Sequence, residues 1–291
     1  MGSPPPYIMP IEHISDTARW VAIYRAMETE RPDAIFRDPY ARALAGARGE
    51  EIVHTLKRGR ATAWAMIVRT AVFDEIIRAS LAQRGITTVI NLAAGLDARP
   101  WRMELPSTLR WVDVDLPAIL KYKTDALRHE TPHCLYEAVA ADLTDAAIRR
   151  PLFQRLGVES RKALVVTEGL LIYLTPDQVG TLADDLHEQA SFAYWLFDLA
   201  NPWLLNYMKK SWGRNVEAGN APFQFAPAEN TKFFEPHGWR ELEFRSSMEE
   251  ARRLKREMPM MWLWRILGML NSKKKRDEMK RISGAVLMER Q

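Results

Sequence analysis

The chain has 291 residues, of which 47% are hydrophobic and 27% are charged. This composition supports a large folded domain and excludes disorder over most of the length. The 41 lysines and arginines nearly balance the 37 aspartates and glutamates, so a nucleic-acid-binding surface is not indicated. With one cysteine, Cys134, and six scattered histidines, an intramolecular disulfide is excluded and no metal cluster of zinc spacing is expected.

The start of the chain, Met-Gly-Ser-Pro-Pro-Pro, lacks the basic and apolar regions of a signal peptide. No stretch approaches the roughly 18 uninterrupted apolar residues that a membrane span needs. We therefore expect a cytoplasmic protein without membrane insertion. Residues 1–13 are expected to be disordered or vector-derived.

The next segment, residues 14–85, is predicted to form a cap of helices, because its apolar residues recur at helical spacing. A long, largely buried helix is expected over 63–77. Asp38 and Pro39 are placed to be the N-cap and the first residue of another helix.

From residue 86 onward, strand-like and helix-like runs alternate, which is typical of a doubly wound α/β domain with a mostly parallel sheet. The elements expected in this core, residues 86–200, are strands over Thr87–Leu92, Leu109–Asp115, Leu135–Ala140, Ala163–Glu168 and Phe192–Leu199, and helices over 117–130, 144–156 and 176–190.

Residues 201–291 are expected to add a helical insert after the fifth strand and the last strands of the sheet, Glu241–Arg245 and Gly284–Glu289. The apolar run 258–270 indicates a buried helix. The basic run 273–276 indicates a solvated turn in preference to a membrane or RNA patch.

The most informative stretch is the turn after the first expected strand, Ala93-Ala94-Gly95-Leu96-Asp97. Gly95 can adopt a positive φ, and the alanines carry too little side chain to keep a ligand away from the main chain. Because open α/β sheets bind nucleotide-like ligands at such strand-to-helix turns, this turn is a candidate ligand site.

Other strands also end in polar residues that would lie at the same edge of the sheet. Asp115, with Asp113 as second choice, lies about twenty residues beyond the turn, where a carboxylate can accept hydrogen bonds from both hydroxyls of a ribose. Asp142 ends the third strand. It could bind an adenine or cap the helix that begins near Thr144, and both readings stay open.

Two charged residues lie in strongly apolar surroundings. Glu168 ends the almost wholly apolar fourth strand, which favours a contact with a cationic ligand, such as a sulfonium-containing amino acid, or with a neighbouring arginine. Arg69 lies in the middle of an apolar helix, and a buried guanidinium needs an anion. A ligand carboxylate, Glu168 or Asp74 would supply one.

Several motifs occur in the same order as in a known family. They are Asp38-Pro39-Tyr40, Arg69-Thr70, Asn91-Leu-Ala-Ala-Gly-Leu-Asp97, Val114-Asp-Leu-Pro117, Ala141-Asp-Leu143 and Glu168-Gly-Leu-Leu-Ile-Tyr-Leu-Thr-Pro176. From about Ser15 to Leu199 the chain therefore resembles the leucine carboxyl methyltransferase family. Within it, the chain is most similar to the bacterial branch of S-adenosylmethionine-dependent O-methyltransferases, often associated with polyketide-type small molecules.

The resemblance implies a class I methyltransferase, Rossmann-like fold, with S-adenosyl-L-methionine as cofactor and S-adenosyl-L-homocysteine as product. The contacts it implies are Arg69 to the cofactor carboxylate, Gly95 to the methionine part, Asp115 to the ribose, Asp142 and Leu143 to the adenine, and Glu168 to the amino group or as a closure of the site, with Asn91, Ala93 and Asp97 in the same cofactor-binding motifs.

The chain departs from the family pattern in two places. Ala98 stands where a threonine usually follows Asp97, so one hydroxyl contact is absent. The additional basic cofactor contact of the family, in the N-terminal helices, could be made by Arg19 or by Arg25.

The implied reaction is methyl transfer to an oxygen, hydroxyl or carboxylate, of a small, partly aromatic or polyketide-like molecule. Such an in-line displacement mainly requires that donor and acceptor be aligned and water excluded. A carboxylate acceptor needs no base, whereas a phenol or enol would be helped by one. The candidate side chains are Asp198, His237 and Tyr173 for catalysis, and Trp203, Tyr207 and Trp212, with Phe223, Phe225, Trp262 and Trp264, for an aromatic acceptor pocket or for packing of the cap.

Other functions stay open. A peptide carboxyl methyltransferase would need an open, positively lined channel, and a tRNA-modifying enzyme finds little support in the charge balance. A non-catalytic cofactor-binding module would keep the same ligand contacts. A dinucleotide-dependent oxidoreductase is disfavoured, because a full G-x-G-x-x-G pattern and an evident Tyr/Lys pair are missing. Self-association into a homo-oligomer is left open.

Overall fold

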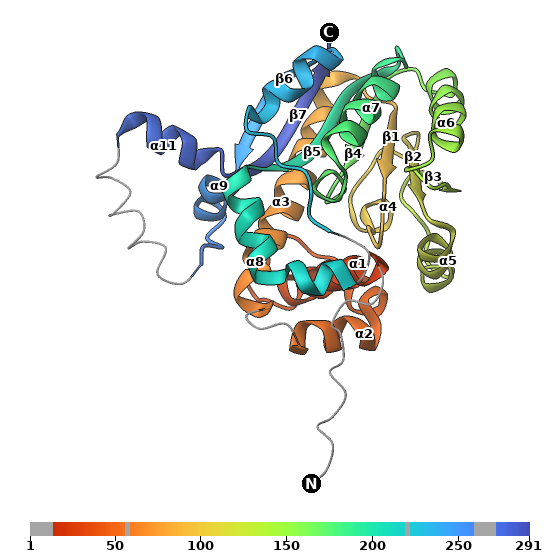
Figure 1. Cartoon of the computed structure of the whole chain (residues 1–291). Coiled ribbons are helices and arrows are strands. Elements are labelled where there is room, and N and C mark those ends of the chain that lie inside the picture. The colour runs from red at the N-terminus through yellow and green to blue at the C-terminus, as the bar shows by residue number, and fades with distance from the viewer. Residues whose placement is uncertain (1–13, 56–58, 219–221, 259–271) are drawn as a thin grey trace.

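The computed structural model describes residues 14–55, 59–218, 222–258 and 272–291 (Figure 1). The expectations for residues 1–13, and almost all of the helix expected over 258–270, lie outside this part of the chain. The basic run is not a turn, because it begins helix α11 (Lys273–Lys280). Among the described residues, no helix is long and apolar enough to cross a membrane.

Within the described part of the chain, seven strands form one sheet in the order β3-β2-β1-β4-β5-β7-β6. Strands β1 to β5 run parallel, and β7 is antiparallel to β5 and β6. The order reverses between β1 and β4, which is the switch point where open α/β sheets bind ligands. The strand bounds are β1 Thr88–Leu92, β2 Arg110–Asp115, β3 Leu135–Ala140, β4 Ala163–Thr167, β5 Phe192–Ala200, β6 Trp239–Ser246 and β7 Ser283–Arg290.

Helices cover both faces of this sheet, as the alternating pattern predicts. One face packs against α6 (Ala146–Glu159), α7 (Pro176–His187) and the 3-10 helix η2 (Asn230–His237). The other packs against α3 (Gly59–Arg84) and α9 (Ser247–Arg253). The fold is therefore the doubly wound α/β class expected from the sequence.

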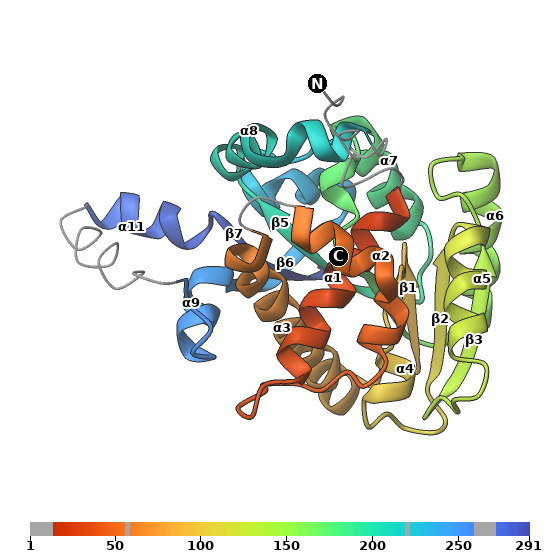
Figure 2. The same ribbon diagram turned by 90° about the horizontal axis from the view of Figure 1, so that it is seen from below.

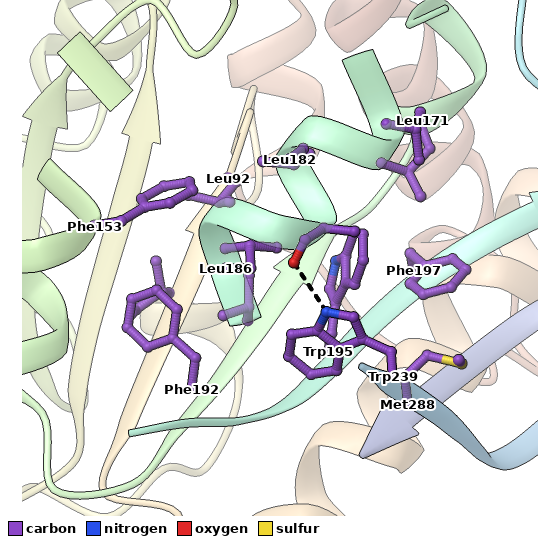
Figure 3. Packing of buried hydrophobic residues seen from close by; sticks show 14 of the residues in the cluster. Leu92, Phe153, Leu171, Leu182, Leu186, Phe192, Trp195, Phe197, Trp239 and Met288 are labelled. Carbon is purple, nitrogen blue, oxygen red and sulfur yellow. Dashed lines mark hydrogen bonds between the residues drawn. The ribbon is translucent and has the colours of Figure 1, made fainter. Parts of the chain in front are cut away.

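The core on the α7 side is strongly aromatic (Figure 3). Trp195, Phe197 and Trp239 are fully buried there. The indole Nε1 of Trp239 donates to the Ala183 carbonyl of α7 at 3.0 Å, so its polar atom is satisfied. This packing fixes α7 against the last strands of the sheet, and close packing of this kind makes the sheet rigid.

The carboxyl ends of the parallel strands are covered by α1 (Ile14–Thr29), α2 (Ala41–Thr55) and α8 (Pro202–Ala218), at the end of the molecule opposite the C-terminus (Figures 1 and 2). The regular helix α2 begins at Ala41, two residues later than Pro39, but the capping contact expected of Asp38 is present, because its Oδ1 accepts the Tyr40 N–H at 3.2 Å. Asp38 is buried, and its carboxylate pairs with Arg25 of α1 at 2.8 Å.

Short elements complete this end of the sheet. They are α4 (Arg99–Arg102) after β1, α5 (Pro117–Ala126) after β2 and the 3-10 helix η1 (Leu171–Tyr173) after β4. Ala98 is the N-cap residue of α4 and offers no side-chain hydrogen bond. The missing threonine hydroxyl therefore corresponds to a missing helix cap.

Candidate active site

The turn after β1 adopts the conformation that the sequence predicts for a ligand-binding turn. Gly95 has a φ of 51°, and Ala93, which carries a side chain, has a φ of 53°. Non-glycine residues in this region are uncommon and cluster at functional sites. A Cβ atom on Gly95 would lie 3.2 Å from Cβ of Ala18, so α1 passes directly over the turn.

Asp115 at the end of β2 faces this turn. Its Oδ2 accepts the Gly95 N–H at 2.6 Å and its Oδ1 accepts the Leu116 N–H at 2.7 Å. Burial raises the pKa of Asp115, although both N–H groups lower it in part. The turn and the carboxylate therefore form one unit at the switch point.

The choice between Asp115 and Asp113 is decided by burial. Asp113 is fully buried, with its Oδ2 bonded to Lys123 Nζ at 2.7 Å and its Oδ1 to the indole of Trp111 at 2.9 Å. Asp113 therefore belongs to the interior of the sheet. The second choice for a ribose contact is not supported.

Asn91 and Asp97 hold the two ends of the turn together. Asn91 Nδ2 donates to Asp97 Oδ2 and to Asp113 Oδ1, both at 3.1 Å. Asp97 also pairs with Arg99 Nη1 at 2.7 Å. Burial favours a raised pKa for Asp97, but Arg99 and the other nearby cations prevail and lower it to about 2. The Asn91–Asp97 hydrogen bond therefore stabilises the conformation of the turn.

Arg69 bridges the ends of β4 and β5. Its Nε donates to Glu168 Oε1 at 3.0 Å and its Nη1 to Asp198 Oδ2 at 3.2 Å. Gly169, with a φ of 70°, donates its N–H to Asp198 Oδ1 at 2.6 Å. A Cβ on Gly169 would lie 3.2 Å from Arg69 Nη1, so a side chain at this position would crowd the guanidinium.

Glu168 therefore pairs with arginine, one of the two contacts expected for it, and Asp74 is not a partner of Arg69. Asp74 instead pairs with two arginines of α4, Arg99 and Arg102, each at 2.7 Å. Burial favours the neutral form of Asp74, but these guanidiniums lower its pKa overall.

We call Arg69, Arg99, Arg102, Asp74, Asp97, Glu168 and Asp198 the arginine cluster. Its three guanidiniums face four carboxylates. Two further pairs, Asp74 with Arg78 and Arg102 with Asp38, which itself pairs with Arg25, bring the network to five arginines and five carboxylates. The buried charges therefore have partners within the protein.

The loop after β3 carries the candidates for an adenine contact. Asp142 is exposed, and its Oδ1 accepts both the N–H and the hydroxyl of Thr144 at 2.9 and 2.7 Å. It does not cap the following helix, because the N-cap of α6 is Asp145, which accepts the Ala147 N–H at 2.8 Å. Leu143 is half-buried beside the core.

Apolar side chains from several elements meet around Tyr173, which lies near Arg69. The 3-10 helix η1 brings Tyr173, whose ring stacks on Phe223 with centroids 5.6 Å apart. Burial, more than nearby Asp198, raises the pKa of Tyr173 to about 12. The members of this acceptor-side cluster are Leu205, Phe223, Trp20, Ile172, Tyr173, Met208 and Ala226.

The structure does not bring three other candidates to this place. Trp203 and Tyr207 stack on each other on the outer side of α8 and are 63% and 46% exposed. His237 pairs with Asp184 of α7 at 2.7 Å, beside the C-terminus and at the opposite end of the strands. Trp212 lies on α8, but its side chain is outside those described, as are Trp262 and Trp264.

The two arginines considered for an additional cofactor contact also differ. Arg25 is buried and committed to Asp38 and to the Leu96 carbonyl, at 2.8 and 2.5 Å. Arg19 is half-buried, donates to the Ala45 carbonyl at 3.1 Å and lies over the ring of Tyr122. Arg25 thus fixes α1 above the turn.

Arg99 and Arg102 are the site residues that sequence reasoning missed. Their signal was local: two arginines three residues apart, directly after the Gly95 turn and flanking the apolar pair Pro100 and Trp101. Both are buried, as charged residues with several partners can be.

Comparison with known proteins identifies the family of the chain. The model of the leucine carboxyl methyltransferase family matches residues 18–187, and the chain belongs to this family. A Streptomyces coelicolor protein, named as a candidate S-adenosyl-L-methionine-dependent methyltransferase, is 37% identical over 189 residues, 60% of this chain and 65% of that protein. One of the same name from Mycobacteroides abscessus is 28% identical over 274 residues, 86% and 90% of the two chains.

Solved structures show the same fold. A duf574 family protein from Streptomyces avermitilis has a TM-score of 0.60 at 13% identity, over 94% of this chain and 97% of that chain. A candidate methyltransferase from Thermobifida fusca has a TM-score of 0.58 at 18% identity and covers 100% of both chains. The predicted class I methyltransferase, Rossmann-like fold is confirmed.

Proposed function

We propose that the protein transfers a methyl group from S-adenosyl-L-methionine to an oxygen of a small, partly aromatic or polyketide-like acceptor. The observation that carries this proposal is the 2.6 Å contact between the Gly95 N–H and Asp115 Oδ2 at the switch point of a family member. When bound, the cofactor supplies a methyl group on a positively charged sulfonium.

We propose a contact among the described residues for each part of this cofactor. Asp115 would accept hydrogen bonds from the ribose, and Asp142 and Leu143 would contact the adenine. Arg69 would hold the carboxylate, and Glu168 the amino group.

The acceptor side favours an oxygen that is already anionic. Both oxygens of Asp198 are engaged, by Arg69 and by the Gly169 N–H. Tyr173, with a pKa of about 12, keeps its proton at neutral pH. In this arrangement Asp198 is paired, Tyr173 holds its proton and His237 lies at the opposite end of the strands. A carboxylate needs no base, so it is the acceptor that we propose first.

Apolar packing supports the same assignment. The acceptor-side cluster packs Trp20 and Phe223 with Tyr173, and Tyr173 is near enough to Arg69 and Asp198 for both charges to act on its pKa. Such side chains exclude water from a displacement reaction and favour a flat apolar acceptor.

A transfer assay with a labelled methyl group tests this function. We expect the labelled methyl group to be transferred to small aromatic carboxylic acids. The product would be a methyl ester, which mild base hydrolyses. Transfer to phenols would give a base-stable ether and require a revised acceptor. Transfer only to a peptide ending in leucine would establish the second candidate, a peptide carboxyl methyltransferase, which the family name supports. Cofactor binding with no transfer to any acceptor would indicate a non-catalytic module.

A further inference from the structure

Arg99 has more ionic partners than a helix-terminal arginine needs. Its guanidinium is 2% exposed and donates to three carboxylates from three parts of the chain. The donors and acceptors are Nε with Asp74 Oδ1 at 2.7 Å, Nη1 with Asp97 Oδ2 at 2.7 Å and Nη2 with Glu168 Oε2 at 2.8 Å. A buried guanidinium with three such bonds is fixed in place.

Glu168 is consequently held from two sides. Its Oε1 accepts from Arg69 and its Oε2 from Arg99. The two arginines differ in access, because the side chain of Arg69 is 15% exposed and that of Arg99 is 2% exposed. Arg69 can therefore exchange a side-chain carboxylate for that of a ligand, whereas Arg99 lies behind Glu168.

Resting on the proposed function, we propose that Arg99 is a positioning residue for the amino-acid part of the cofactor. Arg99 keeps the Glu168 carboxylate aimed at the cofactor amino group once Arg69 turns to the cofactor carboxylate. Through Asp97 the same guanidinium also braces the Gly95 turn. One side chain thereby links the ends of β1 and β4.

The test compares two variants and two ligands by titration calorimetry. Arg99→Lys removes the planar guanidinium that bonds three carboxylates at once. Arg102→Lys is the matched control, because the guanidinium of Arg102 also donates to Asp74, whereas Glu168 and Asp97 receive their hydrogen bonds from Arg99. The ligands are S-adenosylhomocysteine and 5′-methylthioadenosine, which lacks the amino acid. We expect Arg99→Lys to weaken the binding of S-adenosylhomocysteine by about 10- to 100-fold. The binding of 5′-methylthioadenosine should hardly change.

Equal weakening of both ligands by Arg99→Lys, or none, would overturn the positioning role. The control is expected to change both affinities by the same factor. Failure of the wild-type protein to bind either ligand would instead refute the proposed function, so the two failures are distinguishable.

A second measurement uses the wild-type protein and does not depend on folding of the variant. The Nε–H signals of Arg69 and Arg99, assigned by NMR, are followed while S-adenosylhomocysteine is added. The Arg69 signal is expected to shift as its partner changes, and the Arg99 signal to stay in place. A shift of the Arg99 signal as large as that of Arg69 would show that Arg99 exchanges partners itself and would contradict the proposal.

Discussion

At the scale of single residues, burial raises the pKa of Asp115 above the ordinary value of 3.8, although the Gly95 and Leu116 N–H groups lower it in part. A protonated carboxyl cannot accept from both ribose hydroxyls. Affinity for S-adenosylhomocysteine should therefore decline on acidification at a pH above 3.8. Calorimetric titrations from neutral to mildly acidic pH measure this decline.

Asp115→Asn should bind S-adenosylhomocysteine about 10- to 100-fold more weakly at neutral pH, because an amide accepts with one oxygen only. It should also lose the acid-dependent decline. Asp125→Asn is the matched control, since Asp125 lies exposed on α5 and pairs with Lys121 at 2.6 Å. An Asp115→Asn protein with wild-type affinity would remove Asp115 from the site.

The lowered pKa of Asp97 makes the stability of the folded protein depend on pH in acid. Its folded-state pKa of about 2 is below the ordinary 3.8, because nearby arginines outweigh its burial. The unfolded chain therefore takes up the proton first. The stabilisation is complete above pH 3.8 and is lost as the pH falls toward 2, a loss of about 2 kcal/mol in the free energy of unfolding.

Denaturant unfolding at pH 5 and at pH 2.5 measures this loss. Asp97→Asn should be less stable than wild type at pH 5, because Arg99 loses a charged partner, and less dependent on pH below 4. An unchanged pH dependence in this variant would mean that Asp97 carries no such charge in the folded state.

Tyr173 is expected to act as a hydrogen-bond donor, since its pKa of about 12 leaves the phenol protonated at neutral pH. Tyr173→Phe should lower kcat/KM for the acceptor by about tenfold and leave the Kd of S-adenosylhomocysteine unchanged. Steady-state kinetics across neutral pH decide the matter. A wild-type rate that rises with pH, and that loses this rise in the variant, would instead identify Tyr173 as a general base.

At the scale of elements, α8 has one face that packs on the domain and one that is exposed to solvent. Leu205 faces the acceptor-side cluster and is 8% exposed, whereas Trp203, two residues earlier, is 63% exposed. Trp203→Ala should therefore change stability by no more than about 0.5 kcal/mol and leave the acceptor KM unaltered. Phe223→Leu should raise that KM. A larger KM effect from Trp203→Ala would place the acceptor on the outer face of α8.

The elements show which features are predictable from sequence. Alternating apolar runs predicted the strands within a residue or two, because a parallel sheet buried on both faces requires them. The start of α6 was less predictable, since Asp142 and Asp145 both fit an N-cap and the path of the chain after β3 decides between them. The exposed face of α8 likewise depends on which side meets the sheet, and aromatic content alone does not specify it.

At the scale of the whole molecule, positive and negative charges are nearly balanced in the sequence. In the structure, several of them pair in the arginine cluster. Motif positions predicted the cofactor candidates Arg69, Gly95, Asp115 and Glu168. The pairing of Arg99 with Asp74 and Glu168 joins residues 25 and 69 positions apart. Such contacts arise only when strand ends and helices assemble, so local pattern cannot predict them.

Thermal unfolding with added ligand tests the shared cofactor site most directly. A ligand at a hundred times its Kd stabilises the folded state by about 2.7 kcal/mol. We predict that S-adenosylhomocysteine raises the Tm of the wild-type protein, that NAD does not, and that Asp115→Ala abolishes the rise. A rise with NAD alone, or an undiminished rise in Asp115→Ala, would contradict a methyl-donor site built around Gly95 and Asp115.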